Sequence, residues 1–234
     1  MKLFPIKKTL ILVTILAVPG FLYYLLQDKG KNRYKPLPYF GPKEVAATFH
    51  SVRGEQIPDT NYHQVADFQL LNQAGDTLNW SAFDKSIVVM NLFYTHDNSA
   101  TTIANNALTV LRKTYGKNEV IRFVSLSVDP VRDNQEALSA YAAKVGAKPG
   151  KWDLLTGDST QVYNLINKQL FIDAYQKQGT EKRSFVYNNL FILLDTKRHI
   201  RGYYDISTQE GYSKLDDEIK VQIVEVLRNN TDGR

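Results

Sequence analysis

The chain has 234 residues, 43% of them hydrophobic, which suffices for one sizeable buried core but not for two large domains. It contains no cysteine, which excludes disulfide bonds, thiolate metal sites and thiol nucleophiles. Lys2, Lys7 and Lys8 supply three charges of the net +5, and the remaining +2, without a basic stripe interleaved with aromatic residues, argues against nucleic-acid binding.

The first predicted element is a membrane anchor. Residues 1–8 form a basic stretch, and residues 9–26 carry no charge and are mostly Leu, Ile, Val, Ala, Phe and Tyr. A helix of ~18 residues covers roughly 27 Å, close to the thickness of a hydrocarbon core. A cleaved signal peptide is the competing interpretation, but no small-x-small cleavage site follows the apolar run. We therefore expect a single uncleaved transmembrane anchor at 9–26.

A linker and lead-in follow at 27–64. This stretch is rich in Pro, Gly and Tyr, which predicts a linker that becomes irregular structure or a hairpin. The segment 68–78 then predicts two short strands around a turn that contains Gly75. We expect the globular domain to occupy residues 65–230.

Strands and helices alternate along this domain. The continuous apolar run 87–93 predicts a central strand that is buried on both faces. The order of elements favours an α/β domain of thioredoxin-like type. The remaining predicted elements are a helix with Ile103, Ala107, Val110, Leu111 and Thr114, a strand at 120–128, a helix from a capping box of Asp133 and Glu136 to Gly146, a strand at 152–155, a helix with Val162, Leu165 and Ile166, a hairpin of 186–194 and 200–204, and a helix with Leu215, Ile219, Ile223 and Leu227.

The loop after the central strand is the most informative segment. Its sequence is Phe93-Tyr-Thr-His-Asp97-Asn-Ser-Ala-Thr101, and it leads into a predicted helix. Thioredoxin-like proteins keep reactive cysteines or metal-binding thiolates at this place, because the helix dipole and the free N–H groups stabilise a thiolate. Here the frame of such a site is predicted without its reactive atoms.

The segment Ser127-Val-Asp-Pro-Val-Arg-Asp133, followed by a predicted helix, is the most specific pattern in this part of the chain, and the segments 37–41, 68–75, 93–95 and 200–205 add to it. Together these segments, from about Leu37 to Leu227, resemble the Sco/SenC family. The resemblance implies a membrane-anchored thioredoxin-like fold with an N-terminal hairpin extension. It also implies a role in copper delivery to cytochrome c oxidase.

The resemblance further implies a copper site of two cysteines in a C-x-x-x-C loop and one late histidine. In this sequence the cysteine positions fall on Asp97 and Thr101, and the histidine position falls on Tyr187. A carboxylate, a hydroxyl and a phenol do not suit Cu(I). We therefore expect a degenerate copper site with no metal and no cofactor. Disulfide exchange is excluded as well, since it requires thiols.

Alternatives for these residues remain open. Asp97 is either a helix cap or a ligand for a harder metal ion, with His96 or Tyr187 as a weak second ligand. A hydrogen bond between Tyr187 and Asp97 across the former site is the structural hypothesis. Thr101 is expected in the first turn of the helix.

The segment Asp129, Arg132 and Asp133 is either an interaction patch or a local ion pair with a helix cap. The leading hypothesis is a non-enzymatic, membrane-anchored Sco/SenC-like binding or assembly factor in respiratory oxidase biogenesis. Its partner would be an oxidase subunit or a Sco paralogue, and its domain would lie on the periplasmic or extracytoplasmic side of the inner membrane, as the resemblance implies. The alternative is a metal-binding protein with a substituted site.

Overall fold

The computed structural model describes residues 6–29, 36–52, 54–96, 100–178 and 183–231. The chain divides into two units, residues 1–36 and residues 37–234. In the first unit, helix α1 (Ile6–Lys29) includes the segment 9–26 and carries Pro19 in its interior. Among the described residues, no helix combines the length and the apolar character needed to cross a membrane. The predicted anchor is therefore not confirmed.

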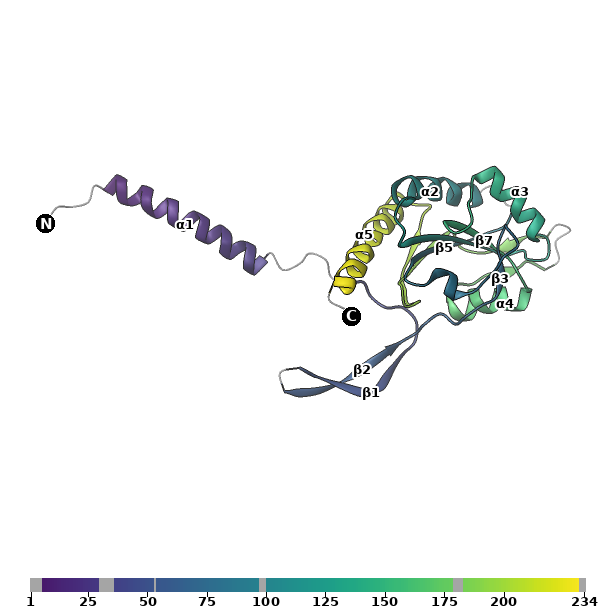
Figure 1. Cartoon of the computed structure of the whole chain (residues 1–234), viewed down its shortest axis with the longest axis horizontal. Coiled ribbons are helices and arrows are strands. Elements are labelled where there is room, and N and C mark those ends of the chain that lie inside the picture. The colour runs from purple at the N-terminus through teal and green to yellow at the C-terminus, as the bar shows by residue number, and fades with distance from the viewer. Residues whose placement is uncertain (1–5, 30–35, 53, 97–99, 179–182, 232–234) are drawn as a thin grey trace. The chain divides into compact units, whose positions relative to one another are not determined.

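The second unit is built on a five-stranded sheet of order β11–β10–β5–β6–β7 (Figure 1). Strands β5 (Ile87–Phe93), β6 (Ile121–Ser127) and β7 (Trp152–Leu155) run parallel to one another. Strand β10 (Leu190–Leu194) pairs antiparallel with both β5 and β11 (Ile200–Asp205). Every residue of β5 is buried. The predicted central strand is thus confirmed, since apolar side chains on both faces suit a strand covered on both sides.

Helices cover both faces of this sheet. One hydrophobic cluster joins α2, α3 and α5 to one face, and a second cluster joins α4 with its neighbouring turns to the other face. The architecture is therefore α/β, as predicted. The helical elements are α2 (Ala100–Tyr115), α3 (Gln135–Val145), α4 (Ser159–Asn164) and α5 (Gln209–Thr231), with a 3-10 turn η1 (Trp80–Phe83) and a π-helical turn η2 (Leu165–Gln169).

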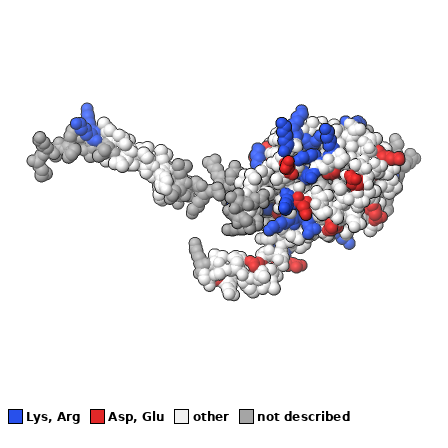
Figure 2. Space-filling model, in the orientation of Figure 1, with Lys and Arg blue, Asp and Glu red and all other residues white. Residues whose placement is uncertain are grey.

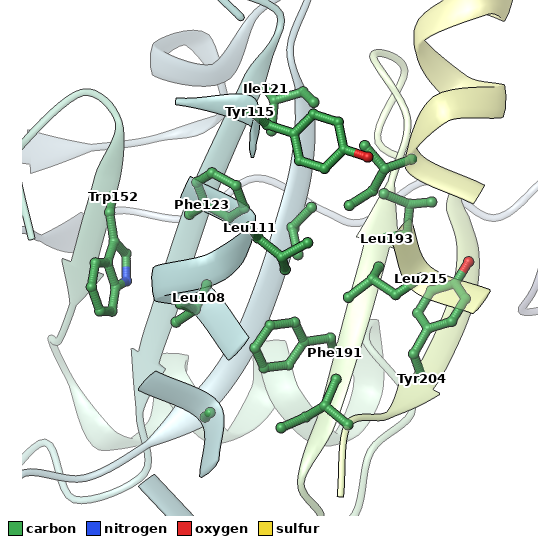
Figure 3. Packing of buried hydrophobic residues seen from close by; sticks show 14 of the residues in the cluster. Leu108, Leu111, Tyr115, Ile121, Phe123, Trp152, Phe191, Leu193, Tyr204 and Leu215 are labelled. Atoms are coloured by element: carbon green, nitrogen blue, oxygen red, sulfur yellow. The ribbon is translucent and has the colours of Figure 1, made fainter. Parts of the chain in front are cut away.

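Figure 3 shows the core beneath α2, where Leu108 and Leu111 face the sheet. The helix is where the sequence predicts it, but of the five residues whose spacing predicts it only Leu111 is buried, and Ile103 and Val110 are 41% and 48% exposed. The adjacent stripe, which includes Tyr115, is buried instead. Both stripes have helical spacing, and the buried one ends in a tyrosine whose hydroxyl donates to the Asp216 carboxylate of α5 at 2.6 Å.

The predicted lead-in contains a long hairpin, β1 (Lys43–Val52) paired with β2 (Glu55–Tyr62), which extends from the sheet in Figure 1. Most of its residues are exposed on both faces. Its base is held to the domain because Tyr62 stacks on Tyr39 with ring centres 3.9 Å apart. Two further short pairs complete the strands, β3 (Leu70–Leu71) with β4 (Thr77–Leu78) and β8 (Tyr175–Gln176) with β9 (Phe185–Val186).

A buried arginine holds the beginning of this unit. Arg201 of β11 is 3% exposed and contacts the carboxylates of Asp195 at 3.1 Å and Glu225 at 3.3 Å. Its guanidinium also donates to the carbonyl oxygens of Leu37 at 2.6 Å and Pro38 at 3.2 Å. Because one cation satisfies two carboxylates and two carbonyls, the chain entering the domain is tied to β11 and α5.

Candidate functional site

The loop after β5 and the segment after β6 meet at one edge of the sheet. The two strands are parallel, with Phe93 opposite Ser127 at their carboxyl ends. The backbone N–H of Val128 donates to the carbonyl of Phe93 at 2.9 Å. This pairing brings the start of the loop after β5, Tyr94 to His96, close to the Asp129–Asp133 segment, although the two are more than 30 residues apart in sequence.

Asp133 joins these two segments. Its carboxylate accepts hydrogen bonds from the backbone N–H of Thr95 at 3.1 Å, the Thr95 hydroxyl at 2.6 Å and the Ser127 hydroxyl at 2.5 Å. The side chain is fully buried. The predicted capping role of Asp133 is wrong, because Asn134 caps α3 by accepting from the Ala137 N–H at 2.9 Å. Asp133 instead stabilises the junction between the two strand ends.

Asp129 is the centre of an ion-pair cluster. It is fully buried and accepts from the Arg132 Nε at 2.6 Å, which is the local ion pair that the sequence predicts. Arg183, which precedes β9, lies 3.3 Å from its second oxygen. Sequence reasoning missed Arg183, and no spacing signal exists, since it lies 51 residues from Arg132. Both aspartates are buried, so a partner at this surface would contact Arg132, whose side chain is 35% exposed.

The structure describes two of the three positions at which the resemblance implies copper ligands. Asp97 lies outside the described residues, so the Tyr187–Asp97 hydrogen bond stays a hypothesis. Thr101 is in the first turn of α2, as predicted, and its hydroxyl donates to the Tyr94 carbonyl at 3.4 Å. Tyr187 is not in a strand as predicted, because β9 ends at Val186 and β10 begins at Leu190.

Aromatic packing and one exposed imidazole surround this edge. The ring of Tyr187 lies 6.0 Å from that of Tyr94 in a T-shaped arrangement, and Phe185 lies 5.2 Å from Tyr94. His96 is exposed, with its Nδ1 2.9 Å from the Thr95 hydroxyl. The hydroxyl of Thr95 donates onward to Asp133. The edge therefore presents an aromatic surface beside a short polar chain.

These residues do not fit the copper ion that the resemblance implies. Thiolates are absent from the whole sequence, the Thr101 hydroxyl is directed to a backbone carbonyl, and the Tyr187 ring lies edge-on to the ring of Tyr94. Cu(I) prefers soft sulfur and imidazole ligands. In the part of the chain that the structure describes, no group of three or more His, Cys, Asp and Glu side chains is arranged to hold a metal ion.

A groove of about 420 Å³ opens beside the ion-pair cluster, between the segment after β6, α4 and the β8–β9 pair. Val131 and Tyr175 line it and are 62% and 55% exposed. Tyr163 also lines it and donates to the Val128 carbonyl at 2.8 Å, and burial raises the pKa of its phenol. Its other lining residues include the polar Ser159, Asn167 and Gln176, and its one charged residue is Arg183, which pairs with Asp129. Aromatic residues and Arg are enriched at protein-binding surfaces.

The fold combines parallel βαβ units with an antiparallel hairpin, and a loop joins the central strand β5 to helix α2. This arrangement defines a thioredoxin-like protein. The loop contains no thiol, so this is one without thiol chemistry. The SCO1/SenC family model matches residues 57–220, and the chain belongs to this family.

Individual relatives agree with this assignment. The chain is 28% identical over 168 residues to the SCO1 protein homolog of Bacillus subtilis (strain 168), covering 71% of this chain and 86% of that one. A SCO1/SenC family lipoprotein from Bacillus anthracis str. Ames is similar in structure, with 20% identity, a TM-score of 0.61, and coverage of 69% and 95%. So is BsSco, described as a member of the Sco family of cytochrome c oxidase assembly proteins with a disulfide switch, with 20% identity, a TM-score of 0.59, and coverage of 68% and 93%. These two structures establish the shared fold.

Proposed function

We propose that this protein is a non-catalytic binding or assembly factor in the biogenesis of cytochrome c oxidase or another respiratory complex, with a degenerate copper site. The observation that supports this proposal is a SCO1/SenC family match over residues 57–220 in a chain that contains no cysteine. In this proposal the protein neither transfers copper nor exchanges disulfides. It acts by holding a partner, either an oxidase subunit or a Sco paralogue.

The groove beside the Asp129 cluster supports a partner-binding role. It borders the family's most specific segment, Ser127 to Asp133, and exposes Val131 and Tyr175 at its rim. Exposed apolar side chains next to a cation are a common composition for a protein interface. The Asp129 ion pairs fix the groove wall, because they hold the turn after β6 to Arg183 before β9.

We also propose that residues 9–26 tether the protein to the inner membrane and that its domain lies on the periplasmic or extracytoplasmic side. The uncharged apolar composition of this segment supports the tether. A lipoprotein among the structural relatives supports attachment by a different route in the family. Carbonate extraction of membranes, with and without residues 1–29, tests this part. Release of the full chain by carbonate would contradict it.

Metal titration of the full chain in an uncharged detergent tests the emptied site. Cu(I), Cu(II), Zn(II) and Ni(II) are titrated into the native chain and into a triple variant Asp97→Cys, Thr101→Cys, Tyr187→His. We expect no binding tighter than about 1 μM in the native chain and a gain of Cu(I) binding in the variant. Tight binding by the native chain that is lost in Asp97→Ala would instead establish the substituted metal site with His96 or Tyr187.

A deletion strain of the host tests the assembly role. Loss of the protein is expected to lower the amount of assembled oxidase, and added copper is expected not to restore it. Complementation with Val131→Asp, Tyr175→Ser is expected to fail, whereas Asp97→Ala is expected to restore assembly. An unchanged oxidase content in the deletion strain, or rescue by copper alone, would contradict the proposal.

A further inference from the structure

A second hollow lies on the opposite face of the sheet from the groove. It has a volume of about 350 Å³ and is formed by the carboxyl-terminal half of α2, the floor residue Phe123 of β6, and the segment between α3 and β7. Four cations line it together with Thr109 and Gly116, and its lining includes no acidic residue. Figure 2 shows Lys and Arg side chains gathered over α2. The four cations are Arg112, Lys113, Lys148 and Lys151.

These cations are not neutralised by acids. In the described part of the chain, every ion pair lies elsewhere, and none includes Arg112, Lys113, Lys148 or Lys151. Two acids occur nearby in sequence. Glu119 is exposed, and Asp153 is buried, with burial raising the pKa of its carboxyl. The hollow therefore concentrates positive charge without a matching carboxylate in its wall.

Helix dipoles account for only part of this charge. Arg112 and Lys113 lie in the last turn of α2, and Arg112 donates to the carbonyl of Gly146, which ends α3, at 2.7 Å. Each helix C-terminus carries roughly half a negative charge, so two such ends offset about one of the four positive charges. About three remain for an anion to neutralise.

Two of the cations are already held in place. The Arg112 guanidinium lies 5.0 Å from the ring centre of the buried Trp152, in addition to its bond to Gly146. The Lys151 ammonium donates to the Asn118 carbonyl at 3.0 Å. Partial burial lowers the pKa of Arg112, as expected for a cation without an anionic partner. Prior ordering of these side chains lowers the entropic cost of binding an anion.

We propose that this hollow, lined by Arg112, Lys113, Lys148 and Lys151, binds a phosphate group. A compact group with two or more negative charges matches several converging cations, and the planar guanidinium of Arg112 can donate to two oxygens of one phosphate. The phosphate belongs either to a small soluble molecule or to an anionic lipid headgroup. The site is independent of the emptied copper loop, and it adds a ligand to the proposed assembly factor.

Calorimetric titration of the full chain in an uncharged detergent tests the site. The soluble probes are inorganic phosphate and pyrophosphate. The headgroup probe is dihexanoyl phosphatidylglycerol, with dihexanoyl phosphatidylcholine as its uncharged counterpart. The test variant is Lys113→Glu, Lys148→Glu, which changes two exposed side chains and leaves the ordered Arg112 and Lys151 in place. The matched control is Lys168→Glu, Lys177→Glu, with the same change in net charge at exposed positions on the other side of the sheet.

We expect saturable binding of pyrophosphate or phosphatidylglycerol with a Kd below about 1 mM, weakened at least about tenfold in the test variant and less than about twofold in the control. Preference for the soluble probes or for phosphatidylglycerol over phosphatidylcholine identifies the source of the phosphate. Absence of saturation by either probe up to about 10 mM would overturn the proposal. Equal weakening in both variants would overturn it too, since net charge alone would then explain binding. Neither outcome depends on copper binding or oxidase assembly.

Discussion

Replacing Asp133 by alanine is expected to remove the side-chain hydrogen bonds that join the loop after β5 to the segment after β6. The carboxylate accepts three hydrogen bonds, two from Thr95 and one from Ser127, at 2.5 to 3.1 Å. Truncation leaves a backbone N–H and two hydroxyls without this acceptor, in a place where Asp133 itself has no solvent exposure. The junction is thus sensitive to a single side chain.

The magnitude follows from those three donors. A hydrogen bond to a charged group contributes about 1.5–3 kcal/mol, and an unsatisfied buried donor costs about 1–3 kcal/mol. Thr95 is only half-buried, so its hydroxyl can turn to water and recover part of the loss. We expect Asp133→Ala to lower the free energy of unfolding by about 3–5 kcal/mol. Asp133→Asn keeps one acceptor oxygen and is expected to cost about 1–2 kcal/mol.

Urea unfolding of the full chain in detergent measures both variants against the wild type. Glu136→Ala is the matched control, since Glu136 is an exposed acid three residues further along, in the first turn of α3, and its loss should change stability by less than about 0.5 kcal/mol. A loss below about 1 kcal/mol for Asp133→Ala would refute the reasoning, because the three hydrogen bonds would then contribute nothing net.

Three further predictions concern the rest of the domain. Arg201→Ala is expected to lower the free energy of unfolding in urea by about 3–5 kcal/mol, because Asp195 and Glu225 lose their shared cation. A loss under about 1 kcal/mol would contradict a stabilising role for these ion pairs. Burial raises the pKa of Tyr203 to about 12, so the unfolded chain releases this proton from about pH 10 while the folded chain keeps it. The free energy of unfolding should therefore fall between about pH 10 and pH 12, and it should fall less in Tyr203→Phe. Urea midpoints that fall equally in the wild type and in this variant would show that Tyr203 is not the cause. The Phe49 side chain in the β1–β2 hairpin is 58% exposed, so Phe49→Ser should change the free energy of unfolding by less than about 0.5 kcal/mol. A larger loss would indicate that Phe49 makes a buried contact.

Much of the fold is predictable from local pattern. The apolar run 87–93 gives a buried central strand, and the segments at 121–127 and 152–155 give the two further strands that run parallel to it. Gly146 ends α3 in the left-handed conformation, as a C-terminal glycine should. Each of these features depends on residues that lie close together in the chain, so the spacing of those residues is enough to predict it.

Other features are not predictable in this way. Apolar residues on α2 form two neighbouring stripes that share Leu111, and packing against the sheet selects the one with Ala104, Leu108 and Tyr115. Asp133 has the sequence context of a helix cap, yet its carboxylate is buried and accepts hydrogen bonds from Thr95 and Ser127. The extra ion pair of Arg183 with Asp129 also joins segments far apart in sequence.

The sequence by itself determines that this member of the SCO1/SenC family has no thiol chemistry, because the absence of cysteine needs no coordinates. It also determines the order of strands and helices, since periodicity is a local property. Tertiary structure alone decides which polar groups meet. Arg112 and Lys148 belong to different elements, and their shared hollow exists only because α2 and the segment before β7 lie over the same part of the sheet. Long-range packing, which no local pattern records, creates such sites.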